Sequence, residues 1–212
     1  MSESHRVRRA DGPVIADVVV PPSKSIANRA LICAALADGE SEITGVAPGD
    51  DTSAMLDCLD RLGIPVAVSK RDGNLVGAVM GSAGNLPAGP ITQPTRLAGT
   101  TSRFITALAA IGPGPYLVDG DPPLRSRPMG PLHNSLIALG ATLEPGEQPG
   151  HLPVTVSGPL RGADAVVMPG NVSSQYVSAL MLVAPYIRRG LRLGLSTPLV
   201  SRPYVEITRA VM

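Results

Sequence analysis

Aromatic side chains are scarce in this 212-residue sequence, which contains four Tyr, one Phe and no Trp. Charge of one sign is also lacking, because 18 basic and 17 acidic residues give a net charge of +1. A nucleic-acid-binding domain is expected to show a basic stripe or aromatic residues on which bases stack, and the sequence shows neither. These shortages argue against a nucleic-acid or membrane partner, so any anion site has to be local.

Cysteine and histidine are equally sparse. Cys33 and Cys58 stand in apolar, helix-like stretches, form no CxxC pair and have no His at ligand spacing. We interpret them as buried, inert thiols, with a disulfide or a reactive role as the alternative. His5, His133 and His151 are isolated, so neither a metal site nor a Ser-His-Asp triad is supported. The sequence also lacks the glycine-rich signatures of nucleotide-binding loops.

Signals for secretion or membrane insertion are missing as well. The first residues, MSESHRVRR, are polar and basic, and they lack the apolar region of a signal peptide. No apolar run is long enough to span a bilayer. We therefore predict a cytoplasmic protein.

What the chain does contain is aliphatic material, since hydrophobic residues make up 44% of it. A core of Val, Leu, Ile and Ala suits closely packed helices on sheets, and the apolar periodicity predicts an α/β chain. The expected strands are 14–20, 41–46, 65–68, 74–79, 116–118, 141–143, 153–156, 165–168 and 191–195. The expected helices are 26–37, one between 50 and 63, 96–111, one around 132–139, 173–184 and one from 202 onward.

The order of strand, helix, strand, helix and hairpin recurs along the chain. We count about two and a half copies of a unit of roughly 70–80 residues, longer than the common solenoid repeats. The alternative is chance similarity, because βα units are common. The last helix has no glycine stop and no closing strands, so we expect the native protein to continue past Met212.

Three helices, one in each copy, begin with small hydroxyl residues or glycine. A helix start exposes unpaired backbone N–H groups and the positive end of the helix dipole, which together suit phosphate and carboxylate groups. The alternative is simple capping, because Ser and Thr are good N-caps. The three starts are Ser23-Lys24-Ser25, Gly99-Thr100-Thr101-Ser102 and Ser173-Ser174-Gln175.

Cations accompany these starts. Lys24 and Arg29 belong to the first start, and Arg103 stands near the second. Arg125 and Arg127 fall in a proline-bounded loop. A guanidinium binds carboxylate or phosphate through two parallel hydrogen bonds, so we predict a shared anion site in which these cations take part. The alternative for any one of them is a solvated surface charge.

Five short motifs follow one another along the chain, and in this order they closely resemble the signatures of the EPSP synthase family of enolpyruvyl transferases. The resemblance runs from about Val14 to the last residue. The motifs are Pro22-Ser23-Lys24-Ser25 followed by Asn28-Arg29-Ala30, Leu97-Ala98-Gly99-Thr100-Thr101-Ser102-Arg103, Arg125-Ser126-Arg127-Pro128-Met129, Val172-Ser173-Ser174-Gln175-Tyr176 and Ser201-Arg202-Pro203-Tyr204.

The resemblance implies an inside-out α/β barrel fold of two lobes, each built from three βαβαββ units, with the active site between the lobes. Residues 21–212 would form the first lobe, with about two and a half units present. Residues 1–20 would hold an N-terminal segment and a crossing strand that belongs to the second lobe. The second lobe itself would be absent from this chain.

The resemblance also implies the reaction and its substrate contacts. The family transfers the enolpyruvyl group of phosphoenolpyruvate to the 5-hydroxyl of shikimate 3-phosphate and releases phosphate, in the shikimate pathway. The residues implied for shikimate 3-phosphate are Lys24, Ser25, Arg29, Ser173, Ser174, Gln175, Ser201 and Tyr204. Those implied for phosphoenolpyruvate are Lys24, Gly99, Arg127 and Gln175.

The implied chemistry needs a proton donor for the methylene carbon and a base for the hydroxyl. Lys24 is the catalytic candidate in this chain. The acidic catalytic residues and further cations would come from the second lobe. The resemblance implies no metal and no organic cofactor, and members of the family are usually monomeric.

Three positions depart from the family pattern. Pro22 stands where the family usually has Gly, which removes a backbone N–H and fixes φ near −65°. Leu97 replaces an Asn and removes one polar contact, while Arg96 stands where a small residue is common. These departures bear on ordinary catalysis more than on the fold.

Two other interpretations stay open. The related UDP-N-acetylglucosamine enolpyruvyl transferase shares the fold but typically carries a reactive Cys in the loop that here reads Leu124-Arg125-Ser126-Arg127. The other interpretation is a non-catalytic protein, either a lone lobe that binds anions or a truncated fragment that needs a second-lobe partner.

Overall fold

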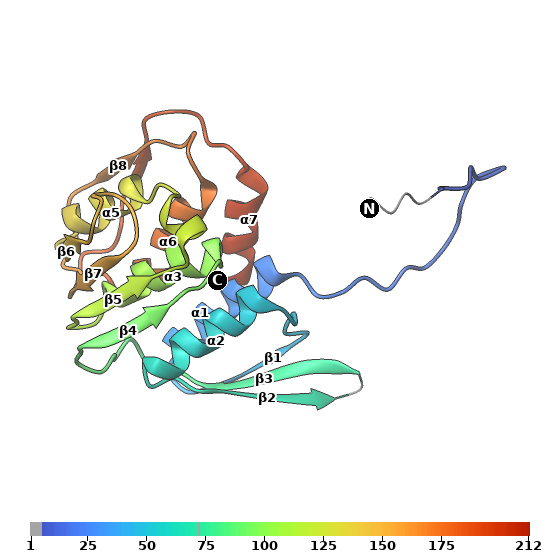
Figure 1. Cartoon of the computed structure of the whole chain (residues 1–212), viewed down its shortest axis with the longest axis horizontal. Helices are drawn as coiled ribbons and strands as arrows, with labels where there is room; N and C mark the ends of the chain where they lie inside the picture. The colour runs from blue at the N-terminus through green and yellow to red at the C-terminus, as the bar shows by residue number, and fades with distance from the viewer. Residues whose placement is uncertain (1–5, 72) are drawn as a thin grey trace.

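The structure is a computed structural model that describes residues 6–71 and 73–212 (Figure 1). Its helices are α1 Lys24–Leu36, α2 Asp50–Arg61, α3 Gly99–Ala109, α4 Pro122–Arg125, α5 Gly130–Ala138, α6 Ser174–Val183 and α7 Arg202–Val211, with a 3-10 turn η1 at Ala184–Tyr186. Its strands are β1 Glu40–Thr44, β2 Val66–Arg71, β3 Asn74–Met80, β4 Ile91–Pro94, β5 Tyr116–Asp119, β6 Thr142–Pro145, β7 Val154–Ser157, β8 Val166–Met168 and β9 Leu193–Leu195.

The strands form three sheets, one for each copy of the repeat. The first has the order β1-β3-β2, the second β4-β5-β7-β6 and the third β8-β9. The second copy runs β4-α3-β5-α5-β6-β7, with the short α4 inserted, and so has the full βαβαββ order. Its parallel pair β4-β5 corresponds to the parallel pair β8-β9 of the third copy. The predicted α/β class with repeated βαβαββ units is confirmed.

Helices occupy the middle of the molecule and the sheets lie around them (Figure 1). Helix α3 is buried at every position from Thr101 to Ala109 and packs against α1, α2 and α6. A helix that presents small or apolar side chains on all faces belongs in a core. With only five aromatic residues in the chain, this core is built from Leu, Ile, Val and Ala, which lets the three helices α1, α3 and α6 approach closely.

The strand expected at residues 14–20 was assigned to the second lobe, so its pairing partners were not expected within this chain. This segment forms no strand, and Ile15 and Val19 are 96% and 99% exposed. In Figure 1 it extends away from the rest of the chain. A strand requires a neighbour to satisfy its backbone groups, and the described part of the chain offers this segment none.

The sequence prediction is wrong in the segment around Arg96. The helix expected from residue 96 begins only at Gly99, because Arg96 has φ +52° and lies in the left-handed region. The preceding strand β4 was not predicted at all. It is rich in proline at and around its ends, and proline is tolerated there because β4 lies at the edge of its sheet.

In the described part of the chain, no helix combines the length and apolar character needed to cross a membrane.

His133 on α5 makes the stability of this fold depend on pH. Its side chain is buried, and burial lowers its pKa to about 4, with smaller contributions from His151 and Arg103. An unfolded histidine has a pKa of about 6.5. Between these values the unfolded chain binds a proton that the folded chain does not, so the stability present above pH 6.5 is lost as the pH falls toward 4.

We expect this histidine alone to lower the free energy of unfolding by about 3 kcal/mol between pH 7 and pH 4. Replacing it with a residue that does not titrate, in His133→Leu, is expected to flatten the profile by that amount. Urea unfolding of both proteins at each pH measures the difference, and subtraction removes the contribution of the carboxylates. Identical pH profiles for the two proteins would contradict the assignment.

Candidate functional site

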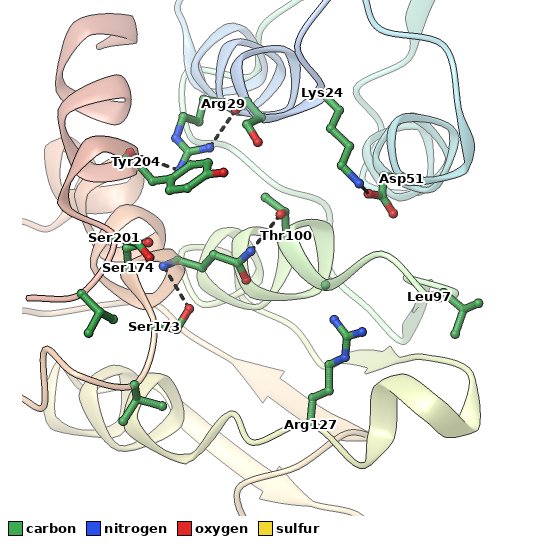
Figure 2. A pocket seen from close by; sticks show the side chains of 15 residues that line it. Lys24, Arg29, Asp51, Leu97, Thr100, Arg127, Ser173, Ser174, Ser201 and Tyr204 are labelled. Atoms are coloured by element: carbon green, nitrogen blue, oxygen red, sulfur yellow. Dashed lines mark hydrogen bonds and ion pairs between the residues drawn. The ribbon is translucent and has the colours of Figure 1, made fainter. Parts of the chain in front are cut away.

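The three helix starts predicted to form one anion site meet at a single cavity of about 500 Å³ (Figure 2). They are the first turns of α1, α3 and α6, and the start of α7 joins them. All ten residues that the sequence analysis assigned to the substrates line this cavity. The ten are Lys24, Ser25, Arg29, Gly99, Arg127, Ser173, Ser174, Gln175, Ser201 and Tyr204.

Simple capping explains only one of the three starts. Ser173 is the N-cap of α6, and its side chain accepts a hydrogen bond of 3.2 Å from the backbone N–H of Gln175. The N-caps of α1 and α3 are Ser23 and Ala98, and neither makes a side-chain capping bond. The first backbone N–H groups of α1 and α3 are therefore left uncapped by side chains, which is the arrangement that favours an anionic ligand.

Lys24 is paired with an acid that the sequence analysis did not assign to the site. Its Nζ lies 2.5 Å from Oδ2 of Asp51, which stands in the first turn of α2 and also lines the cavity. No local signal in the sequence links Asp51 to Lys24, which stands 27 residues earlier. The Lys24 side chain is 66% exposed, so solvent weakens the pair and an incoming phosphate can compete with Asp51 for the ammonium group.

Arg29 places a buried positive charge behind the cavity. Its residue exposure is 1%, and its donors reach four oxygen atoms of the protein: Oγ1 of Thr208 at 2.7 Å, the Ser25 carbonyl at 2.7 Å, and Oγ of Ser178 and the Tyr204 carbonyl at 3.2 Å each. None of these partners is a carboxylate. Burial lowers the pKa of Arg29, and the nearby Tyr204 opposes this shift.

Because most of its donors are already used, Arg29 acts on a ligand chiefly as a fixed charge. The guanidinium also lies 5.3 Å from the ring centre of Phe104 and 5.9 Å from that of Tyr204. These contacts hold it rigidly without neutralising it. Arg29 would therefore attract an anion in the cavity, because none of its described hydrogen-bond partners is an acidic group that offsets its charge.

Arg127 approaches the cavity from the opposite side (Figure 2). Among the ion pairs formed by the described residues, none involves Arg127. A Cβ atom added to Gly99 would lie 3.1 Å from Nη1 of Arg127 and 3.1 Å from Nη1 of Arg103. The absence of a side chain at Gly99 thus lets the start of α3 sit between two guanidinium groups.

The expectation that Arg103 and Arg125 reach the cavity is wrong. Arg103 is only 6% exposed and donates inward to the Gly99 carbonyl at 2.9 Å, and burial lowers its pKa. Arg125 is held by Asp119 through bonds of 2.9 and 2.6 Å from Nε and Nη2. Neither of these two arginines lines the cavity, and Arg127 is the member of its loop that does.

The remaining lining residues complete the walls. Nε2 of Gln175 donates to Oγ1 of Thr100 at 3.1 Å and so links the starts of α6 and α3. Ser201 has φ +53°, an uncommon left-handed conformation that turns the chain into α7 at the cavity. Lining residues that our substrate assignment did not include are Asp51, Leu97, Thr100, Val172 and Val200.

Comparison with known proteins points to one family. The sequence model of the family described as EPSP synthase (3-phosphoshikimate 1-carboxyvinyltransferase) matches residues 9–212. The 3-phosphoshikimate 1-carboxyvinyltransferase of Nostoc sp. is 38% identical over 200 residues, covering 94% of this chain and 47% of that protein. The enzyme of the same name from Methanoculleus marisnigri is 39% identical over 202 residues, covering 95% and 47%. The chain spans about half the length of these curated relatives.

Solved structures show the same fold. EPSP synthase from Acinetobacter baumannii superposes with a TM-score of 0.70 at 23% identity, covering 80% of this chain and 38% of that one. The enolpyruvyl transferase NikO from Streptomyces tendae superposes with a TM-score of 0.55 at 20% identity, covering 88% and 42%. The predicted enolpyruvyl transferase fold is therefore confirmed.

Proposed function

The chain belongs to the EPSP synthase family, and we propose that it forms the lobe of an enolpyruvyl transferase that holds shikimate 3-phosphate. The observation that carries this proposal is the convergence of the α1, α3 and α6 starts, with Lys24, Arg29 and Arg127, on one cavity. The two substrates each bear a phosphate and a carboxylate, and binding them requires such clustered cations and N–H donors. A cytoplasmic location is part of the proposal.

The two substrates would occupy different parts of the cavity. Shikimate 3-phosphate would lie against α6 and α7, where Ser173, Ser174 and Gln175 supply hydroxyl and amide groups and Ser201 and Tyr204 come from the start of α7. Arg29 and Ser25 would add charge and a hydroxyl from α1. Phosphoenolpyruvate would lie between Gly99 and Arg127, and Lys24 would reach both substrates.

In the proposed reaction the 5-hydroxyl oxygen of shikimate 3-phosphate adds to C2 of phosphoenolpyruvate while the methylene carbon accepts a proton. Loss of phosphate and of a methyl proton then restores the double bond. Lys24 can donate or shuttle a proton, and Asp51, 2.5 Å away, orients the ammonium group before the substrates arrive. The remaining acid–base groups would come from a second lobe, with residues 1–20 belonging to that lobe and residues 21–212 to this one.

The two alternatives make different demands on this site. The loop that carries Arg127 has no Cys, which disfavours the UDP-N-acetylglucosamine enzyme. A lone anion-binding lobe would bind phosphate groups without discriminating the shikimate ring and without any turnover.

Calorimetric titration of the 212-residue chain tests the proposal. We expect saturable binding of shikimate 3-phosphate, at least 10-fold weaker binding of shikimate, which lacks the phosphate, and no binding of UDP-N-acetylglucosamine. Phosphate release from both substrates is expected only after a second-lobe chain is added. Preference for the nucleotide sugar, or equal affinity for inorganic phosphate and shikimate 3-phosphate, would refute the assignment.

A further inference from the structure

The carbonyl oxygen of Pro128 joins three walls of the cavity. It accepts a hydrogen bond of 2.5 Å from the hydroxyl of Tyr176 and one of 3.3 Å from Nη2 of Arg103. Pro128 directly follows Arg127, and Tyr176 directly follows Gln175. Arg103 in turn donates to the Gly99 carbonyl. One backbone atom therefore connects the Arg127 loop with the starts of both α6 and α3.

The two donors of this connection are shielded from water. Tyr176 is 1% exposed and Arg103 is 6% exposed, whereas Pro128 itself is exposed. Without the Tyr176 hydroxyl, the Pro128 carbonyl would keep only the 3.3 Å bond from Arg103, so its peptide group would be held less firmly. The Pro128 carbonyl belongs to the same peptide group as the N–H of Met129, which donates to Gly150 at 2.7 Å, and the N–H of Arg127 donates to Leu124 at 3.0 Å. The Tyr176 hydroxyl therefore helps to fix one side of a peptide group whose other side is bound to Gly150.

We propose that Tyr176 is a positioning residue that couples the two substrate subsites by fixing the Arg127 loop to the first turn of α6. This inference rests on the proposed function. An anion bound at Ser173, Ser174 and Gln175 restrains the first turn of α6, and the Tyr176–Pro128 hydrogen bond passes this restraint on to the loop that carries Arg127. Binding at one subsite then favours the productive orientation at the other, so the affinity for phosphoenolpyruvate rises when shikimate 3-phosphate is present.

The chain offers a matched control for removing this hydroxyl. Tyr116 is also fully buried, and its hydroxyl donates to a proline carbonyl, that of Pro87, at the same 2.5 Å. It stands on β5 and does not line the cavity. Tyr176→Phe and Tyr116→Phe thus delete the same atom and the same kind of bond, one beside the substrate site and one away from it.

The test has two readouts on the 212-residue chain. In the absence of substrates, amide hydrogen exchange at Arg127 and Met129 is expected to become about 10-fold faster in Tyr176→Phe and to stay unchanged in Tyr116→Phe. In calorimetry with shikimate 3-phosphate present, Tyr176→Phe is expected to bind phosphoenolpyruvate about 10-fold more weakly. Its affinity for shikimate 3-phosphate alone should stay within about twofold of that of the unmodified chain. Shikimate 3-phosphate should therefore no longer raise the affinity of this variant for phosphoenolpyruvate.

Equal effects of the two substitutions on exchange at Arg127 and Met129 would overturn the positioning role. If exchange became faster in Tyr176→Phe but shikimate 3-phosphate still raised the affinity for phosphoenolpyruvate as much as in the unmodified chain, the proposed coupling would be overturned. If the unmodified chain bound neither substrate, the proposed function would fail, while selective acceleration of exchange in Tyr176→Phe would still support the positioning of the loop.

Discussion

Replacing Arg127 with alanine is expected to weaken binding of phosphoenolpyruvate by about 100-fold, because two charge-assisted hydrogen bonds to the ligand would be lost. Binding of shikimate 3-phosphate should change by less than about threefold, since its proposed contacts come from α1, α6 and α7. The difference between the two losses of affinity is the informative result, and separate calorimetric titrations with each substrate measure it. In a catalytically complete enzyme the same substitution should raise KM for phosphoenolpyruvate selectively.

Two further variants sharpen this prediction. Arg127→Lys keeps the charge but loses the planar pair of donors, so it should recover only part of the affinity. Arg61→Ala removes an exposed arginine that pairs with Asp57 and does not line the cavity, and it should leave both affinities unchanged. Equal losses for the two substrates in Arg127→Ala would show that this residue does not belong to a phosphoenolpyruvate subsite.

Replacing Arg29 with methionine is expected to affect both stability and binding. The variant leaves the hydroxyls of Thr208 and Ser178 and the carbonyls of Ser25 and Tyr204 without their charged donor. We expect a loss of about 3 kcal/mol in the free energy of unfolding, which corresponds to a decrease of about 6–12 °C in Tm for a chain of this size. Removal of the buried charge should also weaken shikimate 3-phosphate binding by at least about 30-fold.

Urea unfolding and calorimetry separate the two effects. Arg202→Met makes the same substitution at an exposed position on α7, where the arginine pairs only with Glu206 among the described ion pairs, and we expect almost no change in stability. Thr208→Val removes the hydroxyl at the centre of the Arg29 contacts but keeps the charge, so it should reduce stability while largely preserving binding. If Arg29→Met unfolded at the same urea concentration as the unmodified chain, these buried contacts would not contribute to stability.

Local sequence was sufficient for much of the site. Ser23-Lys24-Ser25, Gly99 and Ser173-Ser174-Gln175 mark helix starts because small hydroxyl residues and glycine act within one turn of the backbone. The apolar periodicity gave the order of helices and strands for the same reason, since it depends only on neighbouring residues. Residues 14–20 have a composition that suits a strand, but they form none here because their described surroundings provide no strand to pair with.

The identity of the cations that face the ligand was decided by side-chain contacts in the folded chain. Arg125 and Arg127 share one loop, yet Asp119 engages the first and leaves the second directed at the cavity. Likewise Asp51 reaches Lys24 across 27 residues, a pairing that no local pattern predicts. The sequence by itself therefore determined where backbone donors and positive charges occur, because those are local properties. Only the tertiary structure decided which charges were neutralised by protein acids, which were buried in the walls and which remained for an anion.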